Sequence, residues 1–357
     1  MLNYIIRRLL LMIPTLFGLL LINFLIIQAA PGGPVERTLA QLQGHGGGAM
    51  AAGGDVVSQS SGPGGYRGSQ GIDASLIAEI EKQYGFDKPA SERFWQMISQ
   101  FAQLDLGQSF YRDIDVFDLI IEKLPVSLSL GLWSTLLIYL IAIPLGIRKA
   151  RYPGSRFDVW TSGVIIVAYA IPGFLFAILL IILFAGGSYW QILPMQGLVS
   201  DHFDTLDAWG KVKDYAAHLV MPTICLTLGG LATLTLFTRN SFLEELGKQY
   251  VLTARAKGAS ERRVLLGHVF RNAMLILIAG LPATLFGILF TGTFLIEIIF
   301  NLDGLGLLSY ESVINRDYPV IFGTLFLFTL LSLLLRLIGD LCYRLVDPRI
   351  DFARAAT

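Results

Sequence analysis

Charged residues are scarce in this chain. Asp, Glu, Lys and Arg together make up 15% of its 357 residues, whereas hydrophobic residues make up 54%. Soluble globular domains are closer to one quarter charged, so the composition excludes an ordinary soluble protein and indicates a membrane protein. Cysteine is scarce as well. Cys225 and Cys342 lie in or beside apolar stretches, and two such residues make neither a disulfide framework nor a cysteine metal site.

The sequence also lacks the motifs of several enzyme classes. No Walker A sequence occurs, because the Gly-Lys pairs at 210–211 and 247–248 lack the upstream glycine frame. The four histidines are scattered and form no His-Glu-x-x-His, and no Gly-x-Ser-x-Gly is present. We therefore expect neither a metalloenzyme nor a serine hydrolase, and any ATP must be hydrolysed by another protein.

Long apolar runs are abundant instead. A helix needs about 20 apolar residues to cross the hydrocarbon core of a bilayer. The stretches that meet this length are 9–30, 126–147, 159–185, 219–238, 273–300 and 319–341. The first is longer than the apolar region of a signal peptide, which is about 7–15 residues, so we expect an uncleaved span. The sequence thus predicts an all-α, multi-pass membrane protein with six transmembrane helices and a tail over 342–357.

The distribution of positive charge predicts the orientation of these helices. With the N-terminus inside, the inner segments carry sixteen Lys and Arg residues, whereas the two short outer loops carry three. Because Lys and Arg are enriched in cytoplasmic segments, both termini are predicted to be cytoplasmic.

An extracytoplasmic segment, residues 31–125, separates the first two predicted spans. Eleven of the twenty-eight residues from Gly44 to Gly71 are glycine, and few are large and apolar. Such a stretch buries too little surface to offset its ordering entropy, so we predict a flexible linker. Beyond it we expect two short amphipathic helices, one capped by Asp73 and one capped by Ser91.

The longest charged interruption between apolar spans in the C-terminal half is residues 248–272, KQYVLTARAKGASERRVLLGHVFRN, which we name the charged loop. It belongs to a predicted cytoplasmic segment over 239–272. Good helix formers predict a helix over Gln249–Lys257, and Gly258 is suited to the positive φ that ends one. Ser260 is a candidate N-cap for a second helix, with Glu261 in its first turn.

The composition of the charged loop allows two interpretations. The small side chains of Ala254 and Ala256 would let the backbone of a partner protein approach closely, while the flanking cations pair with acidic groups. Alternatively, the loop serves only to fix the orientation of the chain in the membrane through its positive charge.

Ionisable and helix-breaking residues inside the spans are further candidates. Glu297 lies near the outer end of the fifth predicted span, where it reaches the outer interface, or faces a translocation path or a partner span. Arg336 and Asp340 are four residues apart and could pair across one helical turn. Pro172 and Gly173 interrupt the third predicted span and are the candidate hinge.

Several short runs resemble one family of transport proteins. Ala-Arg-Ala-Lys-Gly at 254–258 and Ser-Glu-Arg-Arg at 260–263 resemble the coupling loop of binding-protein-dependent ABC importer permeases of the oligopeptide, dipeptide and nickel class. Asp-Leu-Gly at 105–107 resembles the outer segment of B-type peptide permease subunits, and Leu-Val-Asp-Pro-Arg at 345–349 matches the ending of that class. The long glycine-rich insert resembles the Yej-type permeases, which serve oligopeptides and microcin C-like peptide conjugates.

The resemblance implies a fold, a function and a set of partners. The fold would be that of a type I ABC importer permease with an extracytoplasmic insertion between helices 1 and 2, in the bacterial inner membrane. The partners would be a homologous second permease, two ATPase subunits or a fused ATPase, a periplasmic peptide-binding protein and membrane lipid, with no nucleic acid. ATP and Mg would be bound by the ATPases, and this chain would bind no cofactor. The residues that would contact the ATPase are Ala254, Arg255, Ala256, Lys257, Gly258, Ser260 and Glu261.

An ion-coupled secondary transporter is the alternative from another class. It would require internal repeats and paired broken helices around an ion site at the middle of the membrane. The sequence contains no convincing repeat, and the single carboxylate of Glu297 at the edge of a span is a weak ion site. An ATPase gene beside this one would distinguish the two.

Overall fold

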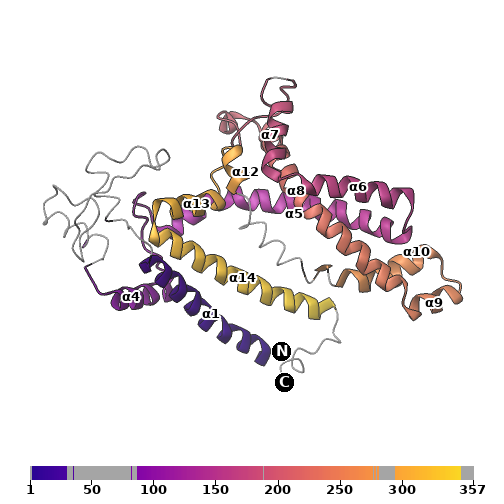
Figure 1. Ribbon diagram of the computed structural model, residues 1–357, viewed down its shortest axis with the longest axis horizontal. Coiled ribbons are helices and arrows are strands. Elements are labelled where there is room, and N and C mark those ends of the chain that lie inside the picture. The colour runs from indigo at the N-terminus through magenta and orange to yellow at the C-terminus, as the bar shows by residue number, and fades with distance from the viewer. Residues whose placement is uncertain are drawn as a thin grey trace, which may run out of the picture. The chain divides into compact units, whose positions relative to one another are not determined.

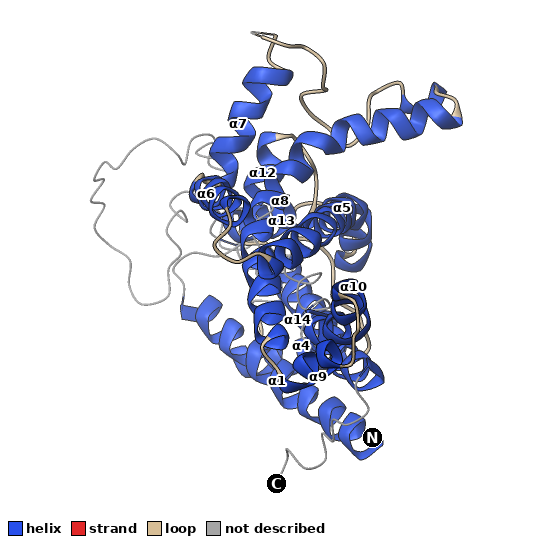
Figure 2. Ribbon diagram, turned by 90° about the vertical axis from the view of Figure 1, so that its right-hand side faces the viewer, coloured by secondary structure: helices blue, strands red, loops and turns tan. Residues whose placement is uncertain are grey.

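The computed structural model describes residues 2–29, 35, 82, 87–187, 189–275, 277, 278, 280 and 294–346. Across these ranges the regular structure is helical, apart from an isolated β-bridge between Gln108 and Asp115 (Figure 2). The predicted all-α class is therefore confirmed. The glycine-rich linker over 44–71 and the helix expected after Asp73 lie outside the described residues.

Within the described part of the chain, four helices are each long and apolar enough to cross a membrane. They are α1 (Leu2–Ala29), α5 (Val116–Arg151), α8 (Ala208–Leu246) and α14 (Tyr318–Val346) (Figure 1). They correspond to the first, second, fourth and sixth predicted spans. α5 has 36 residues and α8 has 39, so both exceed the roughly 20 residues that a crossing needs.

The third predicted span is interrupted at Pro172 and Gly173, the candidate hinge. It consists of α6 (Arg156–Ala170) and α7 (Gly173–Phe184), whose axes differ by 95° (Figures 1 and 2). Proline lacks a backbone donor and disfavours helical geometry in the residue before it. Ile171 accordingly has φ −81° and ψ 120°, and the helix ends there. Counted as one bent span, this pair raises the number of candidate spans among the described residues to five.

The fifth predicted span lies largely outside the described residues, which include only its two ends. The outer end is α12 (Phe294–Ile299), followed by α13 (Leu305–Asn315). The shorter helices elsewhere are α4 (Ala90–Ala102), α9 (Gln249–Ala256) and α10 (Glu261–Arg263), with a 3₁₀ turn, η1, at Phe203–Thr205.

The helix expected near Ser91 is observed as α4, but Ser91 does not cap it. The N-cap residue is Pro89, with φ −60° and ψ 148°, and Ser91 lies in the first turn. The predicted apolar face is present, because Phe94 and Phe101 are buried.

The described chain packs as two compact units. Unit 1 contains Met1–Arg8, Ile121–Leu308 and Leu331–Thr357, and unit 2 contains Leu9–Ile120 and Ser309–Leu330. In unit 2 the Phe94 ring of α4 lies 5.2 Å from the Phe24 ring of α1. All of the candidate functional residues identified from the sequence belong to unit 1.

Asp340 in unit 1 does not pair with Arg336, contrary to the sequence-based expectation. It accepts a hydrogen bond of 2.6 Å from the hydroxyl of Tyr4 and lies 3.2 Å from the guanidinium of Arg8. Among the described residues no ion pair joins Arg336 to Asp340, and the Arg336 side chain is exposed.

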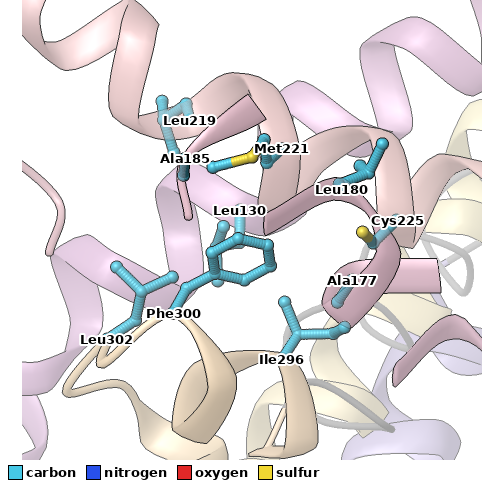
Figure 3. Packing of buried hydrophobic residues seen from close by; sticks show 10 residues of the cluster. All are labelled: Leu130, Ala177, Leu180, Ala185, Leu219, Met221, Cys225, Ile296, Phe300 and Leu302. Carbon is cyan, nitrogen blue, oxygen red and sulfur yellow. The ribbon is translucent and has the colours of Figure 1, made fainter. Parts of the chain in front are cut away.

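An apolar cluster in unit 1 gathers residues from α5, α7, α8 and the segment around α12 (Figure 3). The Phe300 ring lies among these side chains, and Phe300 is only 2% exposed. The buried members are Leu130, Ala177, Leu180, Ala185, Leu219, Met221, Cys225, Ile296, Phe300 and Leu302. Removing apolar surface from water contributes a stabilising free energy of about 25 cal/mol per Å².

Two glycines bring α5 and α8 into close contact. A Cβ added to Gly146 of α5 would lie 2.6 Å from the Cβ of Thr238 and 2.9 Å from the carbonyl oxygen of Thr235. A Cβ added to Gly230 of α8 would lie 2.5 Å from the end of the Ile138 side chain. Thr238 follows Gly146, and Gly230 follows Ile138, by the same number of residues. The contacts therefore advance together along both sequences, so α5 and α8 run parallel to each other. Small residues permit this backbone approach between membrane helices.

We predict that Gly146→Ala destabilises the protein by roughly 1–3 kcal/mol, because the added methyl group overpacks the α5–α8 contact. Gly163→Ala in α6 is the matched control, since a Cβ there meets nothing within 4 Å. The measurement is the thermal unfolding midpoint of each purified variant in detergent. Equal midpoints for both alanine variants would contradict the close packing of α5 on α8.

Candidate functional site: the charged loop and the α6–α7 bend

The charged loop forms a short helix, a tight turn and a second helical segment. α9 covers Gln249–Ala256 and ends one residue before the predicted boundary. α10 (Glu261–Arg263) continues directly into a π-helical turn, η2 (Val264–Val269). The predicted helix–turn–helix arrangement is confirmed, and the π-helical turn is a feature that the sequence did not predict.

Gly258 ends α9 in the conformation that the sequence predicts. Its φ is +80°, a value that residues with a Cβ rarely adopt. The Gly258 N–H donates to the carbonyl of Arg255 at 2.9 Å, and the Ala259 N–H donates to the carbonyl of Ala254 at 3.1 Å. This pair of bonds is a Schellman motif, which satisfies the free carbonyls at the end of α9 and reverses the chain.

The helix after this turn is capped as predicted. The hydroxyl of Ser260 accepts a hydrogen bond of 3.4 Å from the Arg263 N–H, and Glu261 lies in the first turn. The Arg255 guanidinium donates two hydrogen bonds to the Glu261 carboxylate, at 2.9 and 3.1 Å. Both side chains are about half exposed, so the pair contributes less than about 1 kcal/mol, but it links α9 to α10 across the turn.

One face of the charged loop is buried in unit 1. Val251, Val264 and Val269 are 0% exposed and pack in a cluster with Phe242 of α8 and Ala150 of α5. The buried face therefore fixes the loop to the ends of both long helices.

The outward face of α9 carries the residues that a partner protein could contact. Ala254 packs against the buried cluster, so only Ala256 of the two predicted alanines is exposed. Lys257 is exposed beside it, and Leu252 is 56% exposed on the same helix. Sequence reasoning missed Leu252, although its position four residues before Ala256 places both residues on one face of a helix.

Glu245, near the end of α8, organises the start of the charged loop. Its carboxylate accepts hydrogen bonds from the Lys248 ammonium group and from the Tyr250 hydroxyl, the latter at 2.7 Å. The hydrogen bond to Glu245 raises the pKa of Lys248. Burial, together with the bond to Glu245, raises the pKa of Tyr250. Lys248 therefore remains charged and Tyr250 remains a neutral donor at physiological pH.

A cavity of about 240 Å³ adjoins the charged loop. Its polar lining comes from Arg151, the last residue of α5, from Tyr152 after it, and from the Arg255–Glu261 pair. The turn between α5 and α6 therefore lies next to the charged loop in unit 1, although the two are far apart in the sequence.

The α6–α7 bend lies beside a second and larger cavity, of about 420 Å³. Pro172 and Gly173 line it together with Cys225 of α8 and Ile296 of α12. The predicted break at Pro172 and Gly173 is thus a sharp bend next to an open volume. That this bend moves remains a prediction.

Glu297 is fully buried in unit 1 and does not line that cavity. Its carboxylate accepts a hydrogen bond of 2.6 Å from the Leu307 N–H, in the first turn of α13, and lies 3.4 Å from the Ser127 hydroxyl. A Cβ on Gly304 would lie 2.7 Å from the Glu297 carboxyl carbon, so glycine allows this approach. A carboxylate at a helix N-terminus satisfies free N–H groups and is favoured by the helix dipole.

The position of Glu297 bears on the two sequence-based alternatives. The carboxylate does not reach an outer surface of this chain, because it is enclosed by α5, α12 and α13 residues. A role on a translocation path or against a partner span stays a prediction.

The chain belongs to the family described as binding-protein-dependent transport system inner membrane components, whose model matches residues 142–352. This range includes both the charged loop and the α6–α7 bend. The chain is accordingly a multi-pass permease of the inner membrane and not the catalytic subunit. It works with a binding protein and an ATPase.

Curated relatives cover nearly the entire chain. The peptidoglycan transport system permease protein YejB of Agrobacterium fabrum is 58% identical, over 98% of each chain. The inner membrane ABC transporter permease protein YejB of Escherichia coli O157:H7 is 55% identical over the same shares. The oligopeptide transport system permease protein AppB of Bacillus subtilis is 34% identical over 98% of this chain and 99% of its own. The family resemblance seen in the sequence is thereby confirmed.

We predict that Gly258→Val loosens the Schellman turn, because a β-branched residue at positive φ is strained by roughly 1–2 kcal/mol or more. Hydrogen exchange of the α9 amides should then be about tenfold faster than in the unchanged chain. Gly247→Val is the matched control, since Gly247 precedes the same helix with φ −80°. Unchanged exchange in Gly258→Val would contradict the described turn.

Proposed function

We propose that this chain is one of two homologous membrane subunits of an ATP-driven importer of peptides. In the proposed architecture the chain has six transmembrane helices, both termini in the cytoplasm and a type I importer fold. The main support is the identity of 55–58% with two YejB permeases over almost the whole chain. The relatives named for oligopeptide and dipeptide transport, at 33–34% identity, support the same substrate class.

The proposed substrates are short peptides, including those released from peptidoglycan. The relative from Agrobacterium fabrum carries peptidoglycan in its name, which supports this choice. Microcin C-like peptide conjugates are a further substrate class suggested by the resemblance to Yej-type permeases. Peptide length and sequence preference would be set mostly by the periplasmic peptide-binding protein.

In the proposed mechanism the charged loop receives the movement of the ATPases. Two ATPase subunits, or one fused ATPase, bind ATP and Mg and close on each other. The exposed face of α9, with Leu252, Ala256 and Lys257, would contact them, while Gly258, Ser260 and Glu261 fix the turn behind that face. The supporting observation is that the opposite face of the loop is anchored in the core, through Val251, so a force applied to α9 acts on the spans.

The test is peptide uptake by the complete transporter in proteoliposomes that contain the peptide-binding protein. We expect accumulation that requires ATP and persists without an ion gradient. Ala256→Trp should abolish this uptake, because a bulky side chain overfills the contact with the ATPase by roughly 1–3 kcal/mol. Ala256→Ser, which keeps the side chain small, is the matched control.

Two outcomes would contradict this proposal. Uptake driven by a proton or sodium gradient without ATP would favour the ion-coupled alternative. Normal uptake by Ala256→Trp, with normal membrane insertion, would leave the charged loop with only the role of fixing orientation.

A further inference from the structure

Lys149, close to the end of α5, is a lysine with no exposed surface. Its ammonium group lies 3.0 Å from a carboxylate oxygen of Asp158. It also donates to the backbone carbonyl of Asp158 at 2.8 Å and to the hydroxyls of Thr161 and Ser162, at 2.9 and 2.7 Å. All of these acceptors belong to the first two turns of α6, so Lys149 holds α6 to α5.

Asp158 extends the same cluster to α8. Its second carboxylate oxygen accepts a hydrogen bond of 3.0 Å from the Gly154 N–H, in the turn between α5 and α6. That oxygen also lies 3.1 Å from the guanidinium of Arg239, on α8. The Asp158 carboxylate therefore connects α6 to α5, to α8 and to the turn between α5 and α6. We call Lys149, Asp158 and Arg239 the buried ion cluster.

A buried ion cluster needs its partners to stay together. Removing a charge from water is costly, and separating the partners would leave uncompensated charges in a medium of low dielectric. Fixing membrane orientation needs only an exposed cation, such as the neighbouring Arg148. Orientation therefore does not explain why Lys149 has no exposed surface and four polar contacts.

The buried ion cluster lies between the charged loop and the α6–α7 bend. Ala150, the residue after Lys149, packs in the same apolar cluster as Val251 and Val264 of the charged loop. On the other side, α6 leads directly to the bend at Pro172. A continuous set of contacts thus runs from the loop through the end of α5 to α6.

We propose that Lys149, Asp158 and Arg239 are positioning residues that join the charged loop to α6, so that a displacement of the loop moves α6 and changes the α6–α7 bend. The inference rests on the proposed function in one respect, namely that the ATPases displace the charged loop. It adds the route by which that displacement reaches the cavity beside Pro172.

The test uses Lys149→Met, with Arg156→Met as the matched control. Both variants remove one positive charge beside the turn between α5 and α6, but Arg156 is exposed and only Lys149 belongs to the buried ion cluster. A second test variant, Thr161→Val with Ser162→Ala, removes two acceptors of Lys149 without changing any charge. Each variant is studied in the complete transporter with its ATPases and binding protein.

A thiol introduced as Tyr169→Cys reports on the bend, because Tyr169 lines the same cavity as Pro172 and is exposed. Every variant carries this thiol, and its reaction with a membrane-permeant maleimide is followed by mass spectrometry, without nucleotide and with a non-hydrolysable ATP analogue. We expect the labelling rate at position 169 to differ between the two states in the otherwise unchanged chain and in Arg156→Met. In Lys149→Met and in the Thr161→Val, Ser162→Ala variant the rates in the two states should converge. Uptake should fall about tenfold in both while the ATPases remain bound, as for the loss of a typical coupling free energy.

Other results would overturn the inference. It fails if labelling at position 169 in the otherwise unchanged chain does not respond to the nucleotide. It also fails if Lys149→Met keeps both the response and normal uptake. Should Lys149→Met not reach the membrane, the Thr161→Val, Ser162→Ala variant decides by the same two measurements. The labelling needs no transported peptide, so an incorrect substrate class would affect uptake alone and be recognised separately.

Discussion

Polar groups buried inside a protein must find their hydrogen-bond partners within the protein, because burial removes them from water. This constraint accounts for the most specific contacts of unit 1. Lys149 is enclosed by acceptors on α6, and Glu297 satisfies the start of α13. Apolar packing brings the helices together, and these polar contacts select which residues face each other.

The charged loop has a fixed face and a free face, because only one of its faces is buried. Val251 and Val264 are buried beside Ala150, so the loop cannot shift without disturbing the end of α5. The Schellman turn at Gly258 satisfies the end of α9 without help from a partner, which leaves the outward residues available for contact. A loop built in this way can transmit a displacement from a neighbouring protein to the spans, as the proposed mechanism requires.

The features that the sequence predicted correctly depend on neighbouring residues. Apolar runs located the long helices, and the local order of Gly258 and Ser260 determined the turn and the cap in the charged loop. The features it missed depend on residues distant in the sequence. Arg239 is 81 residues from Asp158, so nothing in the local pattern connects them, and both cations of the cluster were counted only as orientation signals. The break at Pro172 was predictable, but its 95° angle depends on packing around the bend.

The central claim is that the charged loop and α6 move as one body, with the change of angle at the α6–α7 bend. It is tested most directly by spin-label distances in the complete transporter, without nucleotide and with an ATP analogue. The exposed residues Leu266, Trp160 and Ile182 provide label sites in η2 of the charged loop, in α6 and in α7. We predict that the Leu266–Trp160 distance stays constant between the two states while the Trp160–Ile182 distance changes. A changed Leu266–Trp160 distance, or an unchanged Trp160–Ile182 distance, would contradict the claim.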